Sequence, residues 1–172
     1  MTTPPFEPPS AADIATVSRQ LARPARNVIG IAARCVCGAP TVVATKPRLD
    51  DGTPFPTLYY LSHPAATAAI STLEANGVMT ELAALLSDAS IAAAYRAAHE
   101  AYLADRNGIE YVAEIDGISA GGMPERVKCL HALAGHALAA GPGVNPIGDL
   151  ALERADWSPS VCECADYEDA EW

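Results

Sequence analysis

Gly117-Ile-Ser-Ala-Gly-Gly-Met-Pro-Glu-Arg-Val-Lys-Cys-Leu-His131 is the stretch on which the organisation of this chain depends. The glycine pair permits a tight turn, and Pro124 is a residue type favoured at the first position of a helix. The pattern predicts a helix that starts at Pro124 and stops at Gly141. Two cations, a cysteine and a histidine follow the turn closely, so this stretch concentrates more chemistry than any other in the sequence.

The segment before this stretch contains the predicted sheet. β-Branched runs bounded by turn residues predict three antiparallel strands, at residues 27–36, 41–45 and 57–61. A capping box from Ser10 to Asp13 predicts a helix before the first strand, and Pro24 ends that helix.

Alanine-rich segments with apolar residues at helical spacing predict further helices, at residues 64–76, 79–86, 89–106 and 149–155. Residues 109–118 are predicted to be an irregular strand, and residues 142–148 a loop. Half of the residues are apolar and only 6% are aromatic, which favours closely packed helices over a thick aromatic core. The expected fold is α+β: a small antiparallel β-meander of about three strands packed with five to six alanine-rich helices.

The length of 172 residues indicates one domain, which we expect to span residues 10–155. Residues 1–9 are rich in proline and are expected to be disordered. Residues 156–172 form an acidic tail that is expected to be flexible and solvated. From Asp149 onward the chain has eight acidic residues and Arg154 as its one basic residue.

The formal net charge of −10 argues against binding to nucleic acid or to anionic membrane surfaces, because both attract basic proteins. The first residues lack the apolar segment of a signal peptide, and charged residues interrupt every apolar run before it reaches the length of a membrane span. We therefore expect a cytoplasmic protein. Its five cysteines are then reduced thiols or metal ligands rather than disulfides.

The first candidate site is an anion-binding pocket at the glycine turn. A helix that begins just after the Gly121-Gly122 turn would present free N–H groups and the positive end of its dipole to a phosphate or carboxylate. Arg126 can hold such a group with two parallel hydrogen bonds, and Lys128 adds a second positive charge. Arg34 and Arg48, from the hairpin and the loop after it, would complete the pocket. The alternative is an ordinary helix with solvated cations.

The second candidate is a metal site made of thiols. Thiolates are soft ligands that suit zinc. Two Cys-x-Cys pairs could close a tetrathiolate: Cys35 with Cys37, and Cys162 with Cys164. Cys129 and His131 resemble a further ligand pair, but two positions apart on the predicted helix they would lie about 200° apart around its axis. Isolated thiols are the alternative.

The third candidate is a nucleophilic thiolate beside an imidazole, with Cys129 or Cys35 next to His63, His99 or His131. The predicted helix places Cys129 well past the N-terminus, where activation by the helix dipole fades. His131 falls on an apolar face of that helix, so we interpret it and His99 as core histidines. The sequence leaves open whether the protein is an enzyme.

Long collinear segments resemble the domain of unknown function 501 family of actinobacteria and their relatives: Arg34-Cys35, Pro47-Arg-Leu49, Asp51–Leu61, Gly121–His131 and Gly141–Pro146. The resemblance spans about residues 28–149 and implies no assigned activity. Genes of this family commonly lie beside those of a septum-formation initiator and an exopolyphosphatase-like enzyme, which implies a context of cell division or polyphosphate metabolism. Cys37 and the Cys162-Glu-Cys164 segment are outside the pattern of the family.

The leading functional hypothesis is a protein that binds a small anionic ligand, bearing a phosphate, nucleotide or carboxylate group, at the glycine turn. One alternative is a non-catalytic protein-interaction module, which would expose an apolar patch of several hundred Å². The second alternative is a zinc-stabilised domain. Zinc is the one cofactor that the sequence suggests, and the oligomeric state stays open.

Overall fold

An antiparallel sheet and a layer of helices form the fold of this protein, seen in a computed structural model that describes residues 6–164. In chain order the elements are α1 (Ala11–Leu21), β1 (Val28–Arg34), β2 (Pro40–Thr45), β3 (Tyr59–Leu61), α2 (Pro64–Ala75), α3 (Val78–Ala84), η1 (Leu85–Ser87), α4 (Ala89–Ile109), η2 (Ala113–Ile115), α5 (Leu130–Ala140) and α6 (Pro146–Arg154), where η marks a 3₁₀ turn. The expected α+β class is confirmed.

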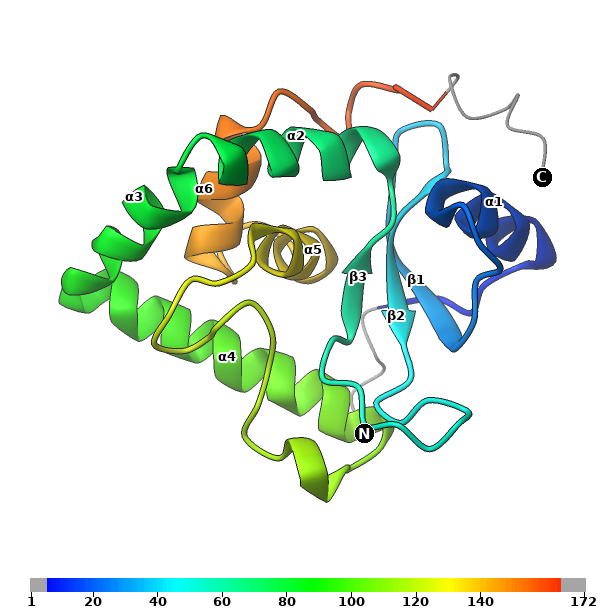
Figure 1. Ribbon diagram of the computed structural model, residues 1–172, viewed down its shortest axis with the longest axis horizontal. Coiled ribbons are helices and arrows are strands. Elements are labelled where there is room, and N and C mark those ends of the chain that lie inside the picture. The colour runs from blue at the N-terminus through cyan, green and yellow to red at the C-terminus, as the bar shows by residue number, and fades with distance from the viewer. Residues whose placement is uncertain (1–5, 165–172) are drawn as a thin grey trace.

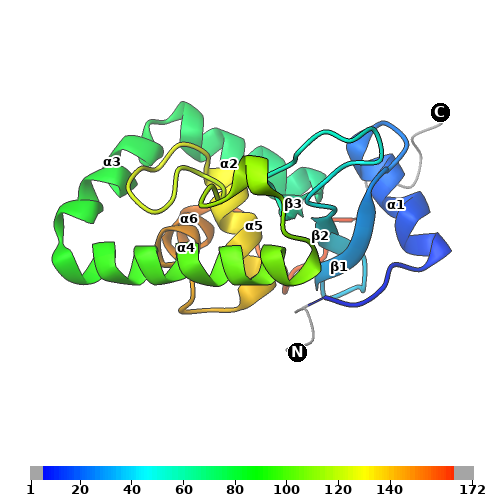
Figure 2. The same cartoon turned by 90° about the horizontal axis from the view of Figure 1, so that it is seen from below.

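The sheet separates two hydrophobic clusters. Its strands lie in the order β1-β2-β3, and every residue of the central strand β2 is buried. Helix α1 covers one face of the sheet, while α2 to α6 lie on the opposite side (Figures 1 and 2). The small cluster under α1 joins Val17 to Ile31 and Val43, and the larger one fills the space between the sheet and the helical layer.

Helix α5 is the centre of the helical layer, with α2, α4 and α6 arranged around it (Figure 1). Leu130, Leu133 and His136 are each fully buried, so this helix has little solvent-facing surface at its core turns. Helix α6 approaches α5 closely because Gly148 has no side chain. A Cβ atom at that position would lie 2.2 Å from the carbonyl oxygen of Leu133.

Side-chain caps set the starts of two helices. The predicted capping box of α1 is present, with the Ser10 hydroxyl accepting from the Asp13 amide. Helix α6 begins at Pro146, earlier than predicted, because the Asn145 side chain accepts from the Gly148 amide at 2.9 Å. No single helix of the described chain has the length and apolarity of a membrane span. The segments Val78–Ser87 and Ala89–Ile109 meet both criteria only when they are taken together, and the chain bends by 107° between them.

The predicted strand at 109–118 is wrong: α4 continues to Ile109 and a 3₁₀ turn follows. A buried cation holds this loop. Arg106 is 1% exposed, and its guanidinium donates to the carbonyl oxygens of Pro56, Ile115 and Ile118. These carbonyls therefore bind a side chain from α4 instead of a neighbouring strand, a pairing that local periodicity does not reveal.

The helix predicted to start at Pro124 begins at Leu130 instead. The preceding residues form a closed loop, because the amides of Arg126 and Lys128 donate to the carbonyl oxygens of Gly122 (2.9 Å) and Gly121 (2.7 Å). Both glycines have positive φ, and a Cβ atom on Gly122 would lie 2.6 Å from the Arg126 carbonyl oxygen. Cys129, with an extended backbone, is thereby placed at the N-cap of α5.

The described ends of the chain contact the rest of the fold, and the disorder and flexibility predicted for residues 1–9 and 156–172 stay a prediction. Glu7 exchanges backbone hydrogen bonds with Ile31, and the ring of Phe6 lies over Gly30. Trp157 is 6% exposed. The remainder of both predicted segments, residues 1–5 and 165–172, is outside the described residues.

Candidate functional site

Four thiols from opposite ends of the chain meet at the β1–β2 turn. The Sγ atoms of Cys35, Cys37, Cys162 and Cys164, here called the thiol cluster, all lie within 4.8 Å of one another. The Cys37 and Cys164 sulfurs are 3.4 Å apart. In a zinc tetrathiolate with Zn–S bonds of about 2.3 Å, tetrahedral geometry separates the sulfurs by about 3.8 Å. The predicted meeting of the two Cys-x-Cys pairs is therefore found, and occupancy by a metal stays a prediction.

The first pair is held in a tight turn. The Cys35 amide donates to the Ala39 carbonyl and the Gly38 amide donates to the Cys35 carbonyl, both at 2.8 Å. Arg34 braces the same turn by donating to the Gly38 carbonyl at 2.9 Å. Cys35 is buried whereas Cys37 is exposed, so the cluster lies at the surface with one thiol anchored in the interior.

The second pair arrives on the segment after α6, which returns along α2 to the hairpin (Figure 1). The Val36 amide donates to the Pro159 carbonyl at 2.8 Å, joining this segment to the turn of the first pair. The indole of Trp157 packs against the imidazole of His63, with ring centroids 5.4 Å apart. These contacts bring Cys162 and Cys164 to the first pair without help from regular secondary structure.

His63 lies directly beneath the thiol cluster. It is fully buried at the N-cap of α2, where its Nδ1 accepts from the Ala66 amide at 3.4 Å. A neutral ring that accepts at Nδ1 carries its proton on Nε2, which lies 3.1 Å from the Cys164 sulfur. Burial lowers the pKa of His63, so the ring is neutral at pH 7 and donates an N–H to this sulfur.

Three of these thiols, Cys35, Cys37 and Cys164, differ in how readily they ionise. The Ala39 backbone amide lowers the pKa of Cys37 to about 7. Burial raises the pKa of both Cys35 and Cys164. A divalent cation would allow several thiolates to exist at such short separations, and its binding would release the remaining protons.

A second cluster surrounds the N-terminus of α5. Ligand atoms of Glu74, Cys129 and His131, here called the thiol–imidazole cluster, lie within 4.8 Å of one another. The prediction that Cys129 and His131 point to opposite sides of one helix is wrong, because Cys129 is the N-cap and is not part of the helical spiral. Glu74 reaches them from α2 and accepts from the Leu130 amide at 2.7 Å.

His131 is held by α2 rather than by the core. Its Nε2 lies 3.0 Å from the Ser71 hydroxyl and 3.3 Å from the Thr67 carbonyl oxygen, and its Nδ1 lies 3.4 Å from Glu74 Oε1. The interpretation of His131 as a core histidine is therefore wrong. His99 is buried as interpreted, with Nδ1 2.8 Å from the Ser119 hydroxyl.

A cavity of about 230 Å³ opens beside this cluster. Cys129 and His131 form part of its wall, and the remaining lining comes from β3, its flanks and two helices: Thr57, Tyr59, Tyr60, Leu61, Thr67 and Ala132. No Asp, Glu, Lys or Arg side chain is among these lining residues. Both Cys129 and His131 are half-buried, so a small molecule in the cavity would reach them.

The residues of the predicted anion pocket do not converge. Arg34 is paired with Glu7 (2.6 Å) and Asp13 (2.7 Å), and this pairing holds the pKa of the Asp13 carboxyl far below its usual range. Arg48 is paired with Glu114 at 2.7 Å. The helix N-terminus expected at Gly121-Gly122 is absent. Binding of an anion by the exposed Arg126 and Lys128 stays a prediction, but the helix N-terminus and the converging arginines on which it was based are not found.

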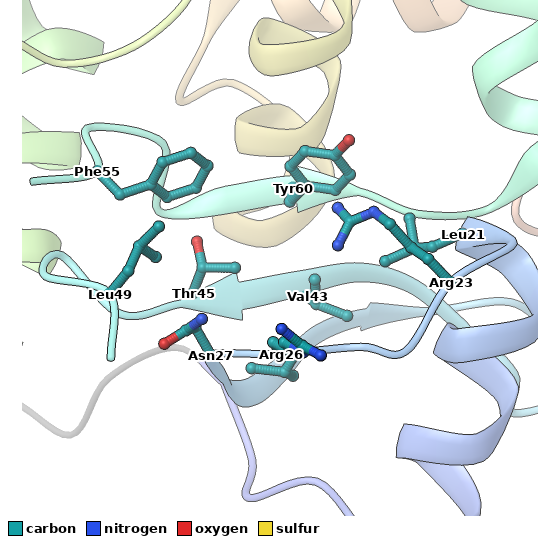
Figure 3. A pocket seen from close by; sticks show the side chains of 10 residues that line it. Leu21, Arg23, Arg26, Asn27, Val43, Thr45, Leu49, Phe55 and Tyr60 are labelled. Carbon is teal, nitrogen blue, oxygen red and sulfur yellow. The ribbon is translucent and has the colours of Figure 1, made fainter. Parts of the chain in front are cut away.

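Two arginines that the sequence reasoning did not select line another cavity, of about 220 Å³, on the α1 side of the sheet. Arg23 and Arg26 follow α1, and within the described chain neither guanidinium has a carboxylate at ion-pair distance. Figure 3 shows Val43, Thr45 and Tyr60 between these arginines and the apolar side chains of Leu49 and Phe55. Whether Arg23 and Arg26 have a carboxylate partner depends on the tertiary structure, so the sequence contains no signal for this cavity.

Four large apolar side chains of the described residues are exposed. Val36 and Val161 flank the thiol cluster, whereas Tyr111 and Ile118 lie in the loop after α4. These four exposed side chains do not test the interaction-module hypothesis, which stays a prediction.

Comparison with known proteins gives a family but no activity. The model of the family described as protein of unknown function DUF501 matches residues 31–153, well over half of the chain. The chain therefore belongs to this family. No curated protein and no solved structure matches it. The matched region contains Cys35, Cys37, Cys129 and His131 but ends before Cys162.

Proposed function

We propose that this DUF501 protein binds one zinc ion through Cys35, Cys37, Cys162 and Cys164, and that the ion fastens the segment after α6 to the β-hairpin. The observation that carries the proposal is the convergence of four sulfurs within 4.8 Å from two pairs separated by more than 120 residues. Zinc takes four ligands in its structural sites, and a tetrathiolate leaves no position open for a substrate. The proposed role is thus structural.

The surroundings of the thiols support this assignment. His63 donates an N–H to Cys164, the kind of outer contact that orients a metal-bound ligand. Trp157 packs on His63, and both side chains are buried. An iron ion also accepts four thiolates, so the identity of the metal has to be measured.

The test is metal analysis of protein purified without chelator. We expect one zinc per chain in the wild type and a loss of that zinc in Cys162→Ser and in Cys164→Ser. Cys129→Ser is the matched control, since it removes a thiol outside the cluster and should retain the metal. A folded, metal-free wild type with the four cysteines joined as disulfides would overturn the proposal. One iron per chain would show that the bound metal is iron and not zinc.

A second candidate function keeps the anionic ligand but moves it to the Arg23/Arg26 cavity. Two arginines without ion-pair partners among the described residues stand beside an apolar floor, in a chain whose net charge is −10. Such a cavity suits a molecule with an apolar body and one carboxylate or phosphate group, because guanidinium forks match both groups. The thermal shift produced by phenyl phosphate provides the test.

We expect phenyl phosphate to raise the melting temperature, and the neutral analogue phenol not to do so. Arg23→Gln/Arg26→Gln should abolish the shift. Arg19→Gln, which removes an exposed arginine from α1 itself, should leave the shift unchanged. An equal shift in all three proteins would show that the anion acts elsewhere.

A further inference from the structure

The thiol–imidazole cluster has no role in the zinc proposal and stands independently of it. It combines a thiol, an imidazole and a carboxylate within 4.8 Å, at the wall of a cavity of about 230 Å³. We propose that Cys129 is a nucleophile for acyl transfer, with His131 as its general base and acid, acting on a small uncharged ester or thioester in this cavity.

The orientation of His131 supports the role of base. The Thr67 carbonyl oxygen at Nε2 and the Glu74 carboxylate at Nδ1 both only accept hydrogen bonds, so the surroundings of the ring favour a proton on each nitrogen. Glu74 therefore stabilises a proton that arrives at Nδ1. With Cys129 Sγ in the same small cluster, Nδ1 is the acceptor for the thiol proton.

The local charges favour transfer of that proton. The His131 imidazole lowers the pKa of Cys129, and the Ala132 amide at the start of α5 contributes in the same direction. Cys129 raises the pKa of His131, and the Glu74 carboxylate adds to that increase. Both directions stabilise a thiolate–imidazolium pair. The N-terminal end of the eleven-residue α5 provides a further positive potential at the sulfur.

The covalent step balances without a further reactant. The thiol proton moves to His131 Nδ1, a bond forms between Cys129 Sγ and the carbonyl carbon, and the C=O π electrons move to the oxygen. Collapse of this intermediate restores the carbonyl and breaks the bond to the leaving group, which takes the proton from His131. An acyl thioester on Cys129 and a free alcohol or thiol result, and water can then hydrolyse the thioester.

The cavity defines the class of acyl group. Its walls are aromatic, aliphatic and hydroxyl-bearing, and the opposite charges of Cys129 and His131 are paired with each other, so a charged substrate would lose solvation without gaining an unpaired counterion. Tyr60 can contact the flat face of an acyl or aryl group, and Thr57 and Thr67 can hydrogen-bond to a carbonyl oxygen. A short, neutral acyl chain fits this environment.

The experiment uses 4-nitrophenyl acetate with the zinc-loaded wild-type protein. We expect release of one equivalent of nitrophenol per chain and an acetyl group that peptide mass spectrometry places on Cys129. The rate constant should reach half of its plateau below pH 8.5, about the ordinary pKa of a thiol. His131→Gln should lower the rate about a hundredfold at pH 7, the usual contribution of a general base.

Lys128→Gln is the matched control, because it removes an adjacent positive charge and leaves the imidazole in place. Its rate should stay within about threefold of the wild type. Acetylation at another residue, or an unchanged rate in His131→Gln, would overturn the proposal. A second zinc per chain that disappears in Cys129→Ser would overturn it as well, because Glu74, Cys129 and His131 would then be metal ligands. If His131→Gln does not fold, the acetylation site and the pH profile of the wild type decide.

Discussion

The thiol cluster and the thiol–imidazole cluster both contain cysteine sulfur, but the groups around the sulfur favour different chemistry in each. In the thiol cluster, four sulfurs crowd together at the surface and the nearest imidazole is a buried, neutral N–H donor. In the thiol–imidazole cluster, one sulfur faces an imidazole whose pKa is raised and a cavity that admits a ligand. Crowding favours a metal that closes the site, whereas isolation beside a base favours reactivity.

The difference shows that the partner of a cysteine matters more than its exposure. Cys37 is the more exposed thiol, yet the convergence of three other sulfurs suits it to metal binding. Cys129 is half-buried but lies next to a proton acceptor. The comparison is therefore tested most directly by substitutions that change protein stability at one cluster and not at the other.

The largest expected effect is the loss of zinc from the thiol cluster. Removal of the metal with a chelator should lower the free energy of unfolding by about 4 kcal/mol, relative to free zinc at 1,000 times its dissociation constant. Denaturant titration with and without chelator measures this. Cys164→Ser should be insensitive to chelator, and an equal response in that variant would place the effect elsewhere.

Acidification should reveal a third kind of histidine site, in the core. His136 is fully buried and stacked on Tyr59, and burial lowers its pKa to about 4. The unfolded chain binds this proton near pH 6.5, so stability is complete above pH 6.5 and falls by about 3 kcal/mol as the pH drops toward 4. Denaturant titrations at pH 7 and pH 4.5, on zinc-free protein, measure the loss.

The matched variant for this acid effect is His136→Leu. It should be less stable at neutral pH, where the Asn145 side chain loses its partner at Nδ1, but its stability should change less between pH 7 and 4.5. A wild type as stable at pH 4.5 as at pH 7 would contradict the assignment.

An intermediate effect is expected beneath the thiol cluster. In His63→Asn the shorter side chain can still cap α2 but cannot reach the Cys164 sulfur. Zinc affinity should fall about 10- to 100-fold, as for other outer contacts of metal ligands. Competition with a chromophoric chelator measures the affinity, and unchanged helical circular dichroism would show that α2 is intact.

The smallest effect on stability is expected at the thiol–imidazole cluster. His131→Gln should change the free energy of unfolding by less than about 1 kcal/mol, as for most substitutions at partly exposed sites. The pKa of His131 is raised, so the stability that its charge contributes is present below pH 6.5 and is lost as the pH rises through the folded pKa. The difference between wild type and variant should therefore shrink from pH 5.5 to pH 8.

Local pattern accounts for much of the fold. The capping box at Ser10, the β-branched runs and the alanine-rich helices were each predicted near the positions where the structure has them. The strand at 109–118 was not correctly predicted, because Arg106 takes up its carbonyl groups from a distant turn of α4. The start of α5 was predicted too early. The amides of Arg126 and Lys128 donate to the carbonyl oxygens of Gly122 and Gly121 and close a loop, instead of forming the first turns of a helix at Pro124.

The candidate sites depend more strongly on tertiary structure. The sequence suggested a tetrathiolate from residue type and spacing alone, and the fold brings those four sulfurs together. For Cys129 and His131 the same geometric reasoning failed, because it assumed a helix in which the true N-cap is extended. Glu74 had no signal at all, since it comes from α2.

By itself the sequence determined the class of fold, the family and the residue types able to bind zinc, because these depend on composition, periodicity and short-range spacing. Only the tertiary structure decided what Gly117–His131 does. The Gly121-Gly122 turn closes a loop on itself, places Cys129 at the N-cap of α5 and faces it with His131 and Glu74. Which groups meet across a fold depends on long-range packing, and that is where the chemistry of this stretch arises.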